Sequence, residues 1–249
     1  MNVKITYLDH SGFLVEWNNC YWLFDYFKGQ IPQLDSSKML LVFVSHSHGD
    51  HFNPEIFDLY NKHPMTTYLI SSDIKIDEKT KPKYGITDEV YQRIIVVKSN
   101  EEYELFDQDN ISIVVNTLKS TDKGVAFIIR YKEKTIYHAG DLNLWMWIGD
   151  DKQYNNDMKA RFYKEITKLK GMSIDIAFAP LDPRQEDWYS LGINALLDTA
   201  KVRYVFPMHF WDKPETIKWY KLELEVENNE RNTEIMDVSK QGHSWKLDI

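Results

Sequence analysis

Apolar and β-branched residues come in short runs through the first half of the chain, and turn-forming residues separate the runs. Runs of this kind predict β-strands, and the close spacing of the first three, within residues 3–24, predicts an antiparallel meander. Residues 39–44 are apolar without alternation, which is typical of a strand buried on both faces. Asn53-Pro54-Glu55 then has a cap residue followed by proline and predicts the start of a helix. Further strands are expected at 67–70, 94–97, 111–117, 125–131 and 135–138.

The second half of the chain alternates between helical and strand-like patterns. Residues 151–170 carry apolar side chains three and four positions apart, which predicts an amphipathic helix that covers a sheet. No linker rich in Pro, Gly or Ser and no fixed-period repeat divides residues 1–249, so we expect one α/β domain. The other expected elements are strands at 174–179 and 204–207 and helices at 191–201 and 214–227.

Composition and charge narrow the class of protein. The 249-residue chain is 43% hydrophobic, which supports a substantial core, and its formal net charge is -8. Lys and Arg are scattered, so a nucleic-acid partner is disfavoured. Cys20 is the only cysteine, which excludes an internal disulfide and a thiolate metal cluster and fits a reducing compartment. Because no signal-peptide pattern or run of roughly 18 apolar residues occurs, we expect a cytoplasmic protein that does not span a membrane.

The densest group of metal-binding side chains directly follows the apolar run at 39–44. It is His46-Ser-His48-Gly-Asp50-His51. In an extended loop, residues two apart project to the same side, so His46 and His48 can face one point. The intervening glycine allows a tight turn that directs Asp50 and His51 to a neighbouring point. Imidazole and carboxylate groups at this density suit a zinc-type ion that keeps a position open for water, and the spacing fits a pair of ions.

The motif H-x-H-x-D-H between a buried strand and a capped helix resembles the defining motif of the metallo-β-lactamase superfamily. The resemblance covers nearly the whole chain, because further matches follow in the superfamily's order. These are Asp25 after an early strand, Asp141 in His138-Ala-Gly-Asp141, and His209 in Pro207-Met-His209. The resemblance implies an α/β (α+β) fold, an αββα sandwich of two mixed β-sheets covered by helices.

The resemblance also implies how the ligands are divided between two ions. Asp50, His51 and His209 would hold one ion, and Asp141 would bridge it to the ion of the two histidines that open the motif. Asp25 would fix the ligand loop without touching the metal. The expected metal ligands are His46, His48, Asp50, His51, Asp141 and His209.

The sequence departs from the superfamily pattern at one ligand. The superfamily usually supplies another histidine from the loop after a mid-chain strand, and the corresponding residues 116–124 contain none. Either Asp122 or Ser120 substitutes through oxygen, or the site of His46 and His48 is weak or empty. We therefore expect one tightly bound ion, and two if the substitution holds. Zinc is the first expectation, and manganese and iron(II) also suit such ligands.

Several other residues are candidates for the neighbourhood of the cleft. His10, in Leu8-Asp-His10-Ser-Gly, resembles an early turn in the branch that includes ascorbate-phosphate lactonases, and is either a turn residue or a substrate-side group. Trp145 and Trp147 form either an apolar substrate wall or part of the core. Arg184 can clamp an anionic group, although a surface salt bridge is the favoured interpretation. For His138, simple packing is favoured.

The resemblance implies metal-assisted hydrolysis of a small ester, lactone, amide or phosphoester, with Asp50 orienting or deprotonating the attacking water. Phosphate-loop, dinucleotide-binding and serine-elbow motifs are absent from the sequence. The expected partner is a small molecule, an anionic one included, and a homo-oligomer is compatible with the sequence. Two alternatives stay open: a nuclease of the same fold that cleaves RNA or another phosphodiester, and a non-catalytic metal-binding or sensor protein.

Overall fold

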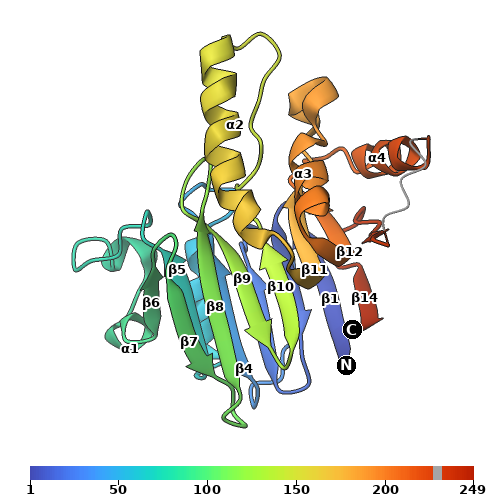
Figure 1. Ribbon diagram of the computed structural model, residues 1–249. Helices are drawn as coiled ribbons and strands as arrows, with labels where there is room; N and C mark the ends of the chain where they lie inside the picture. The colour runs from blue at the N-terminus through green and yellow to red at the C-terminus, as the bar shows by residue number, and fades with distance from the viewer. Residues whose placement is uncertain (227–231) are drawn as a thin grey trace.

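The computed structural model describes residues 1–226 and 232–249, which form two seven-stranded β-sheets (Figure 1). In the first sheet the strand order is β14-β1-β2-β3-β4-β5-β6. Neighbours from β14 to β3 pair antiparallel, and neighbours from β3 to β6 pair parallel. The strands are β1 (Asn2–Asp9), β2 (Gly12–Glu16), β3 (Cys20–Phe24), β4 (Met39–Val44), β5 (Thr66–Ser71), β6 (Ile94–Val97) and β14 (Ser244–Asp248).

The second sheet repeats this division, with the order β13-β12-β11-β10-β9-β8-β7. Neighbours from β7 to β10 pair antiparallel, and neighbours from β10 to β13 pair parallel. Each sheet is therefore mixed, as the sequence predicts. The strands are β7 (Glu102–Phe106), β8 (Ser112–Lys119), β9 (Val125–Tyr131), β10 (Lys134–His138), β11 (Ser173–Pro180), β12 (Lys201–Met208) and β13 (Glu234–Ile235).

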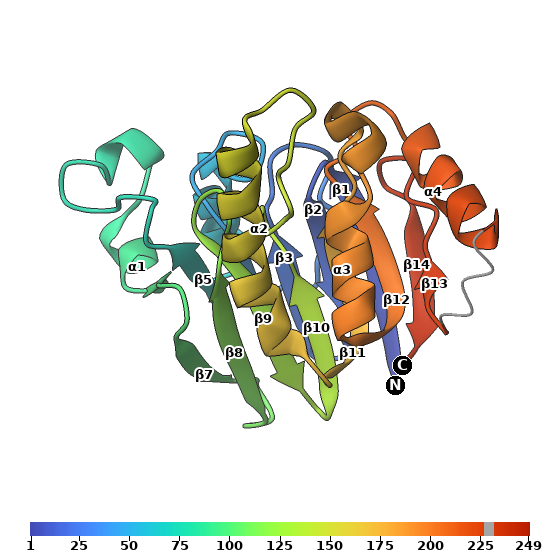
Figure 2. The same cartoon turned by 45° about the horizontal axis from the view of Figure 1, so that its top comes forward.

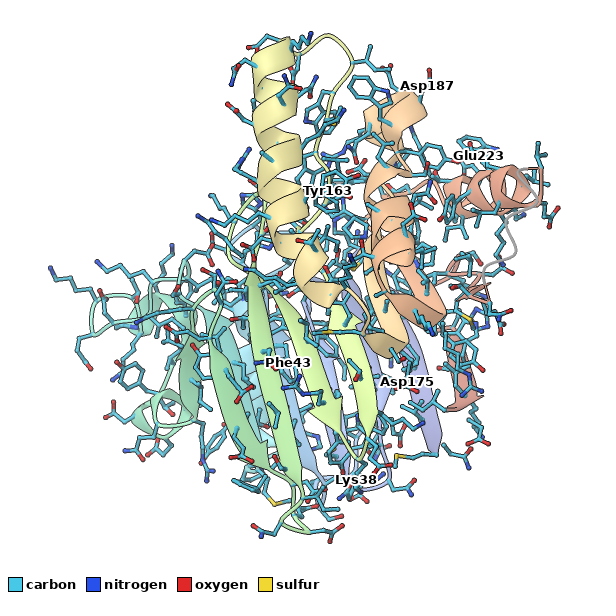
Figure 3. The ribbon with its side chains drawn as sticks, viewed as in Figure 1. Lys38, Phe43, Tyr163, Asp175, Asp187 and Glu223 are labelled. Atoms are coloured by element: carbon cyan, nitrogen blue, oxygen red, sulfur yellow. The ribbon has the colours of Figure 1, made fainter. Side chains whose placement is uncertain are left out.

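The core lies between the inner faces of the two sheets. Phe43 of β4, labelled in Figure 3, is fully buried there and contacts Phe24 of β3 and Phe127 of β9 at ring-centroid distances of 4.7 and 5.3 Å. Phe178 of β11 lies 4.5 Å from Phe13 of β2, so aromatic rings join the sheets at several strands. Aromatic side chains supply large buried areas and account for much of the cohesion between the layers.

Helices cover the outer faces and complete the predicted αββα sandwich. In Figure 2, α2 (Lys152–Ile166) and α3 (Leu191–Thr199) lie over the second sheet, with α4 (Glu215–Val226) to one side. The outer face of the first sheet packs against a 3₁₀ helix at Pro54–Asn61 and the short helix α1 (Asp88–Tyr91) through a second apolar cluster. None of the helices in the described ranges combines the length and apolar character needed to cross a membrane.

Helix α2 covers its sheet with only part of its length. Asp151 caps it by accepting a hydrogen bond from the backbone of Tyr154, and Met158, Phe162 and Ile166 are buried. Tyr154, which the apolar spacing places on the same face, is 41% exposed instead. The first turns of α2 extend beyond the strands in Figure 1, so no sheet lies beneath them.

Other differences from the expected elements concern short segments. The helix after the metal-binding motif is a 3₁₀ helix, and the predicted helix at 151–170 ends as an α-helix at Ile166 and continues as a 3₁₀ turn. Strand β7 was not expected, because charged residues interrupt its apolar positions. The predicted helix at 214–227 ends at Val226 in the structure, and Glu227 lies outside the described residues.

The parallel strands bring their carboxyl ends to one edge of the sandwich. In Figure 3, Lys38, which precedes β4, lies at the bottom of the view, and Asp187, which follows β11, lies at the top. Loops that follow the carboxyl ends of parallel strands commonly form ligand sites in α/β proteins. The expected metal ligands follow β4, β10 and β12, so the topology gathers them at this edge.

Candidate metal centre

Two groups of potential metal ligands lie at this edge of the sandwich. One group contains His46 and His48 from the loop after β4, Asp122 from the loop after β8, and Asp141 from the loop after β10. One ligand atom from each residue lies within 4.8 Å of the others. We call this group the exposed cluster, because the side chains of His48 and Asp122 are 36% and 43% exposed.

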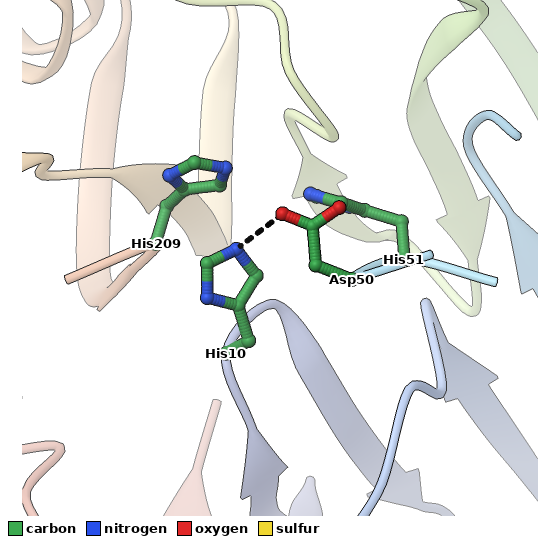
Figure 4. Close-up of side chains that lie close together, drawn as sticks. All are labelled: His10, Asp50, His51 and His209. Atoms are coloured by element: carbon green, nitrogen blue, oxygen red, sulfur yellow. Dashed lines mark ion pairs between the residues drawn. The ribbon is translucent and has the colours of Figure 1, made fainter. Parts of the chain in front are cut away.

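The other group contains His10, Asp50, His51 and His209, again with ligand atoms within 4.8 Å of one another. Figure 4 shows the four side chains turned toward one space, with His10 between His209 and Asp50. We call this group the buried cluster, because its three histidines are at most 4% exposed. The four residues come from the turn after β1, the metal-binding motif and the end of β12.

Asp141 connects the two clusters. Its Oδ2 lies 3.4 Å from His46 Nε2 in the exposed cluster. Its Oδ1 lies 3.2 Å from His51 Nε2 and 3.4 Å from His209 Nε2 in the buried cluster. One carboxylate oxygen therefore faces each cluster, which is the arrangement needed to bridge two ions.

The donor atoms that face the two clusters are arranged to bind divalent ions instead of hydrogen-bonding to one another. The Nε2 atoms of His10, His46 and His51 and Oδ1 of Asp141 are buried and make no hydrogen bond with any described residue. Leaving such atoms unpaired costs about 1–3 kcal/mol each, so a partner is expected. Two ligand atoms about 2.1 Å from a tetrahedral ion lie about 3.4 Å apart, which matches the separations around Asp141.

The far ring nitrogens of the motif histidines are fixed by buried partners. His51 Nδ1 donates to Asp25 Oδ2 at 2.8 Å, and Asp25 also accepts hydrogen bonds from the backbone and hydroxyl of Ser45. Because the Ser45 hydroxyl donates to Asp25, it accepts from His46 Nδ1 at 2.9 Å. In their neutral forms both imidazoles therefore keep a proton on Nδ1 and direct Nε2 toward the site. Asp25 thus lies where the resemblance to the superfamily places a residue that supports the ligand loop.

His209 is fixed in the same way by a residue that the sequence interpretation did not assign. Its Nδ1 donates to Asp182 Oδ2 at 2.9 Å, and Arg184 donates to both oxygens of Asp182. Burial alone would raise the pKa of Asp182, but the hydrogen bonds from His209 and Arg184 lower it to about 2. The position of Asp182 after β11 was the available signal, because β11 pairs with the strand that carries His209.

The carboxylates around His51 favour a proton on its ring in the absence of an ion. Burial would lower this pKa, but Asp141 and Asp25 raise it well above its usual value. Metal binding therefore has to displace a proton from His51, and such sites lose affinity as the pH falls.

His138 does more than pack in its strand. Its Nε2 donates to the carbonyl of Ser11 at 3.0 Å, and its Nδ1 accepts from the backbone N–H of Gly140 at 3.1 Å. The ring stacks on Phe24 at 4.9 Å, and burial lowers the pKa of His138, which keeps the ring neutral. His138 therefore holds the turn that carries His10 against the turn that carries Asp141.

Two glycines allow the loops of the two sheets to meet at the site. Gly124 has a φ of 66°, and a Cβ there would lie 1.9 Å from the carbonyl oxygen of Ser45. Gly140 has a φ of 49°, and its Cβ would lie 2.6 Å from Ser45 Cβ. Val125 N donates to that same Ser45 carbonyl at 2.9 Å. Only glycine allows this approach without displacing the metal-binding motif.

The loop without histidine places a carboxylate at the exposed cluster. Asp122 Oδ2 lies 3.4 Å from His48 Nδ1, whereas Ser120 Oγ accepts a hydrogen bond from Asp122 N. Of the two candidate substitutes, the structure therefore brings Asp122 to His48.

A cavity of about 210 Å³ adjoins the exposed cluster. Trp145 and Trp147 stack at 6.2 Å, and Trp145 is also 5.3 Å from the ring of His209. Arg184, which the sequence interpretation favoured as a surface salt bridge, pairs with buried Asp182 while its guanidinium lies 4.6 Å from the Trp211 ring. The lining residues are Thr121, Asp122, Trp145, Trp147, Tyr154, Met158 and Arg184.

Comparisons with known proteins agree with this geometry. A family model described as a β-lactamase superfamily domain matches residues 4–153. A UPF0173 metal-dependent hydrolase of Nanoarchaeum equitans is 26% identical over 245 residues, which cover 96% of this chain and 97% of that protein.

Among solved structures, Igni18, a metallo hydrolase from the archaeon Ignicoccus hospitalis, has a TM-score of 0.61 and 18% identity, and the match covers 100% of both chains. The metallo-β-lactamase fold protein YhfI of Bacillus subtilis has a TM-score of 0.62 and 15% identity, and the match covers 99% of both chains. These two likenesses concern the fold.

The family match spans more than half of the chain, so the chain belongs to the metallo-β-lactamase superfamily. With the family and the two His/Asp clusters together, it is a metal-dependent hydrolase of that superfamily.

Proposed function

We propose that this hydrolase cleaves a small ester, lactone or phosphoester that enters through the cavity beside the exposed cluster. The observation that carries the proposal is the position of Asp122, which belongs both to the exposed cluster and to the wall of the cavity. A substrate that contacts Trp147 and Arg184 on the cavity wall therefore has its reacting group next to the metal ligands. At about 210 Å³, the cavity is smaller than the roughly 300–1,000 Å³ of drug-sized sites, which favours a small substrate.

The two clusters would hold one divalent ion each, with Asp141 facing both. Bound there, such ions lower the pKa of a coordinated water molecule and polarise a carbonyl or phosphoryl oxygen. Zinc is the expectation from the sequence, and the second carboxylate that Asp122 adds shifts the exposed cluster toward manganese or iron(II). Elemental mass spectrometry of protein purified without a metal-affinity tag would identify the ions.

Asp50 is the residue we expect to orient the attacking water. Burial would raise its pKa, but contact with His10 and the charge of His51 lower it far below its usual range. A carboxylate with so low a pKa is a weak base, so it accepts a hydrogen bond from water rather than keeping the proton. Its side chain is 24% exposed, which leaves it accessible to solvent at the edge of the buried cluster.

The cavity wall suggests which substrates fit. Trp145, Trp147 and Met158 supply apolar surface, and Arg184 supplies the one positive charge among the lining residues of this cavity. Asp182 engages Nε and Nη2 of Arg184, and no described residue accepts a hydrogen bond from Nη1. Nη1 can therefore bind an anionic group, so we propose a substrate with a short apolar part and a carboxylate or phosphate.

The proposal is tested by turnover of metal-loaded protein on matched pairs of esters, lactones and phosphoesters, one of each pair anionic and one neutral. Asp50→Asn should lower kcat by about 10² or more, whereas Asp58→Asn, an exposed carboxylate on the 3₁₀ helix, should not. Arg184→Gln should reduce kcat/KM more for the anionic member of each pair than for the neutral one. Inertness of the fully metal-loaded wild type toward all three bond types would contradict the proposal.

A further inference from the structure

His10 occupies a position in the buried cluster that the H-x-H-x-D-H motif does not explain. Its Nε2 lies 3.4 Å from Asp50 Oδ2, marked by the dashed line in Figure 4, and its ring lies 4.2 Å from the ring of His209. The side chain is 4% exposed and Nε2 makes no hydrogen bond with any described residue. Because buried polar atoms are nearly always paired, a buried imidazole nitrogen that faces other ligand atoms without a hydrogen-bond partner indicates a bound group such as a metal ion.

The backbone holds His10 there under strain. Its φ is 51°, in the left-handed region that residues with a side chain rarely adopt, and His209 beside it has a φ of 64°. The two residues also contact through their main chains, because His209 N donates to the carbonyl of His10 at 3.4 Å. Such conformations cost of order 1–3 kcal/mol each and are found where the surroundings require a particular side-chain direction.

The turn that carries His10 is fixed from two sides. The carbonyl of Ser11 accepts the hydrogen bond from buried His138. A Cβ on Gly12 would lie 2.9 Å from the carbonyl of Asp9 and 3.2 Å from that of Asp25, so the turn sits closely on the loop of Asp25. The turn of His10 therefore lies against the backbone of the residue whose side chain orients His51.

We propose that His10 Nε2 is a further ligand of the ion in the buried cluster. The inference rests on the proposed metal centre and deepens it. The separation of 3.4 Å between His10 Nε2 and Asp50 Oδ2 falls within the roughly 3.0–3.6 Å expected for neighbouring ligands about 2.1 Å from a five-coordinate ion, and it resembles the 3.2–3.4 Å separations around Asp141. By contrast, the hydrogen bonds that fix the far sides of His51 and His209 are 2.8 and 2.9 Å long.

With His10 bound, the buried ion has three imidazoles and two carboxylates from the protein. The ligands are His10, Asp50, His51, His209 and the Oδ1 atom of Asp141. Five protein ligands exceed the four of a typical zinc site, so the buried cluster suits an ion that accepts five or six ligands, such as Mn²⁺, Fe²⁺ or Co²⁺. Fewer positions then stay open on the buried ion than on the exposed one.

Binding of Co²⁺ tests the assignment without using activity. The experiment compares wild type with His10→Ala and His10→Gln by competition against a chelator and by visible absorption. His63→Ala is the matched control, because His63 is also a buried histidine with an unpaired ring nitrogen but belongs to neither cluster. We expect both His10 variants to bind the tighter Co²⁺ at least about 10-fold more weakly and to absorb more intensely, since fewer ligands surround the ion.

The two His10 variants separate a ligand from a hydrogen-bond donor. Glutamine keeps an N–H donor near Asp50, so recovery of wild-type affinity and spectrum by His10→Gln would overturn the inference, as would an unchanged His10→Ala. If both variants fail to fold, a crystal structure of the Co²⁺-loaded wild type decides. A distance of about 2.1 Å from Nε2 to the ion supports the inference, and a distance beyond about 3 Å overturns it. A wild type that binds no Co²⁺ would contradict the proposed metal centre itself.

Discussion

The two clusters share Asp141 but differ in how their ligands are held. In the buried cluster, His51 and His209 each donate to a carboxylate that accepts further hydrogen bonds, Asp25 and Asp182 respectively. In the exposed cluster only His46 has such support, through the Ser45 hydroxyl. His48 and Asp122 project from loops into partly solvated space.

This difference predicts that the two sites differ in metal affinity and in distance from the substrate. Ligands fixed by buried partners lose little freedom when an ion binds, so the buried cluster should bind its ion tightly. The ligands of the exposed cluster must be ordered on binding, but they face the cavity that contains Trp147 and Arg184. We therefore expect the buried ion to be retained and the exposed ion to be both the weaker one and the one nearer the substrate.

The largest expected effect comes from removing the residue that the clusters share. Asp141→Ala removes a ligand from both ions and leaves the buried histidines without a bridging anion. We expect loss of both ions and of turnover, beyond the roughly 10- to 100-fold that loss of an outer partner costs. Elemental mass spectrometry after gel filtration measures this, with Asp157→Asn on the exposed face of α2 as control. Retention of one full equivalent of metal would show that the two sites are independent.

Gly124→Ala should disrupt the exposed cluster through the backbone. The new Cβ would lie 1.9 Å from Ser45 O and 2.7 Å from His46 Cβ, at a φ of 66°. Overpacking and left-handed strain together should destabilise the fold by about 2–5 kcal/mol. Gly171→Ala is the control, because its φ is 79° but nothing lies within 4 Å, so only about 1–2 kcal/mol is expected. If urea denaturation gave the same loss of unfolding free energy for both variants, the close approach of Gly124 to Ser45 would not contribute to stability.

Asp182→Asn weakens the support of His209 without removing a ligand. We expect about 10- to 100-fold weaker metal binding at the buried cluster, measured by chelator competition. The pKa of Asp182 is about 2 in the folded protein against about 3.9 when unfolded, so its stabilisation is fully present above about pH 5 and is mostly lost as the pH falls to 2.

This contribution of Asp182 amounts to about 2–3 kcal/mol in metal-free protein. In urea denaturation, the free energy of unfolding of the metal-free wild type should therefore fall by most of this amount between about pH 5 and pH 2, relative to Asp182→Asn. Parallel pH dependences in the two proteins would contradict the predicted role of the carboxylate.

The smallest effect is expected for Asp122→Ala, because Asp122 is exposed and supports one cluster only. The exposed ion should bind about 10-fold more weakly and the buried ion should be unaffected. Asp122→His supplies the imidazole that the superfamily pattern has at this ligand and should keep the exposed ion. Isothermal titration with Mn²⁺ measures both sites, and weaker binding at the tighter site would contradict the separation of the clusters.

The fold was largely predictable from the sequence, because buried strands such as β3, β4 and β9 have compact apolar runs with the observed bounds. The structure likewise brings the six expected ligands together. Four of them could be grouped from their local spacing in the motif, whereas Asp141 and His209 followed only from the resemblance to the superfamily. The roles of these residues as ligands stay predictions that metal binding has to test.

The roles of Asp182, His10 and Asp122 were less accessible from the sequence. Asp182 meets His209 only because β11 and β12 lie side by side, and the sequence singled out its neighbour Arg184 instead. His10 is separated by 40 residues or more from its cluster partners, and its direction depends on a φ that no local pattern required. For Asp122, the sequence left Ser120 as an equal candidate, and the loop geometry after β8 distinguishes them.

Stepwise removal of metal tests the division between a buried and an exposed site. Wild-type protein loaded with Mn²⁺ is titrated with increasing concentrations of a chelator, while bound metal and turnover are measured in the same samples. We expect two equivalents that leave in two separate steps, with turnover lost in the first step as the exposed ion leaves. Release of both ions in one step, or a protein that holds a single ion and keeps full turnover, would contradict the division between a buried and an exposed site.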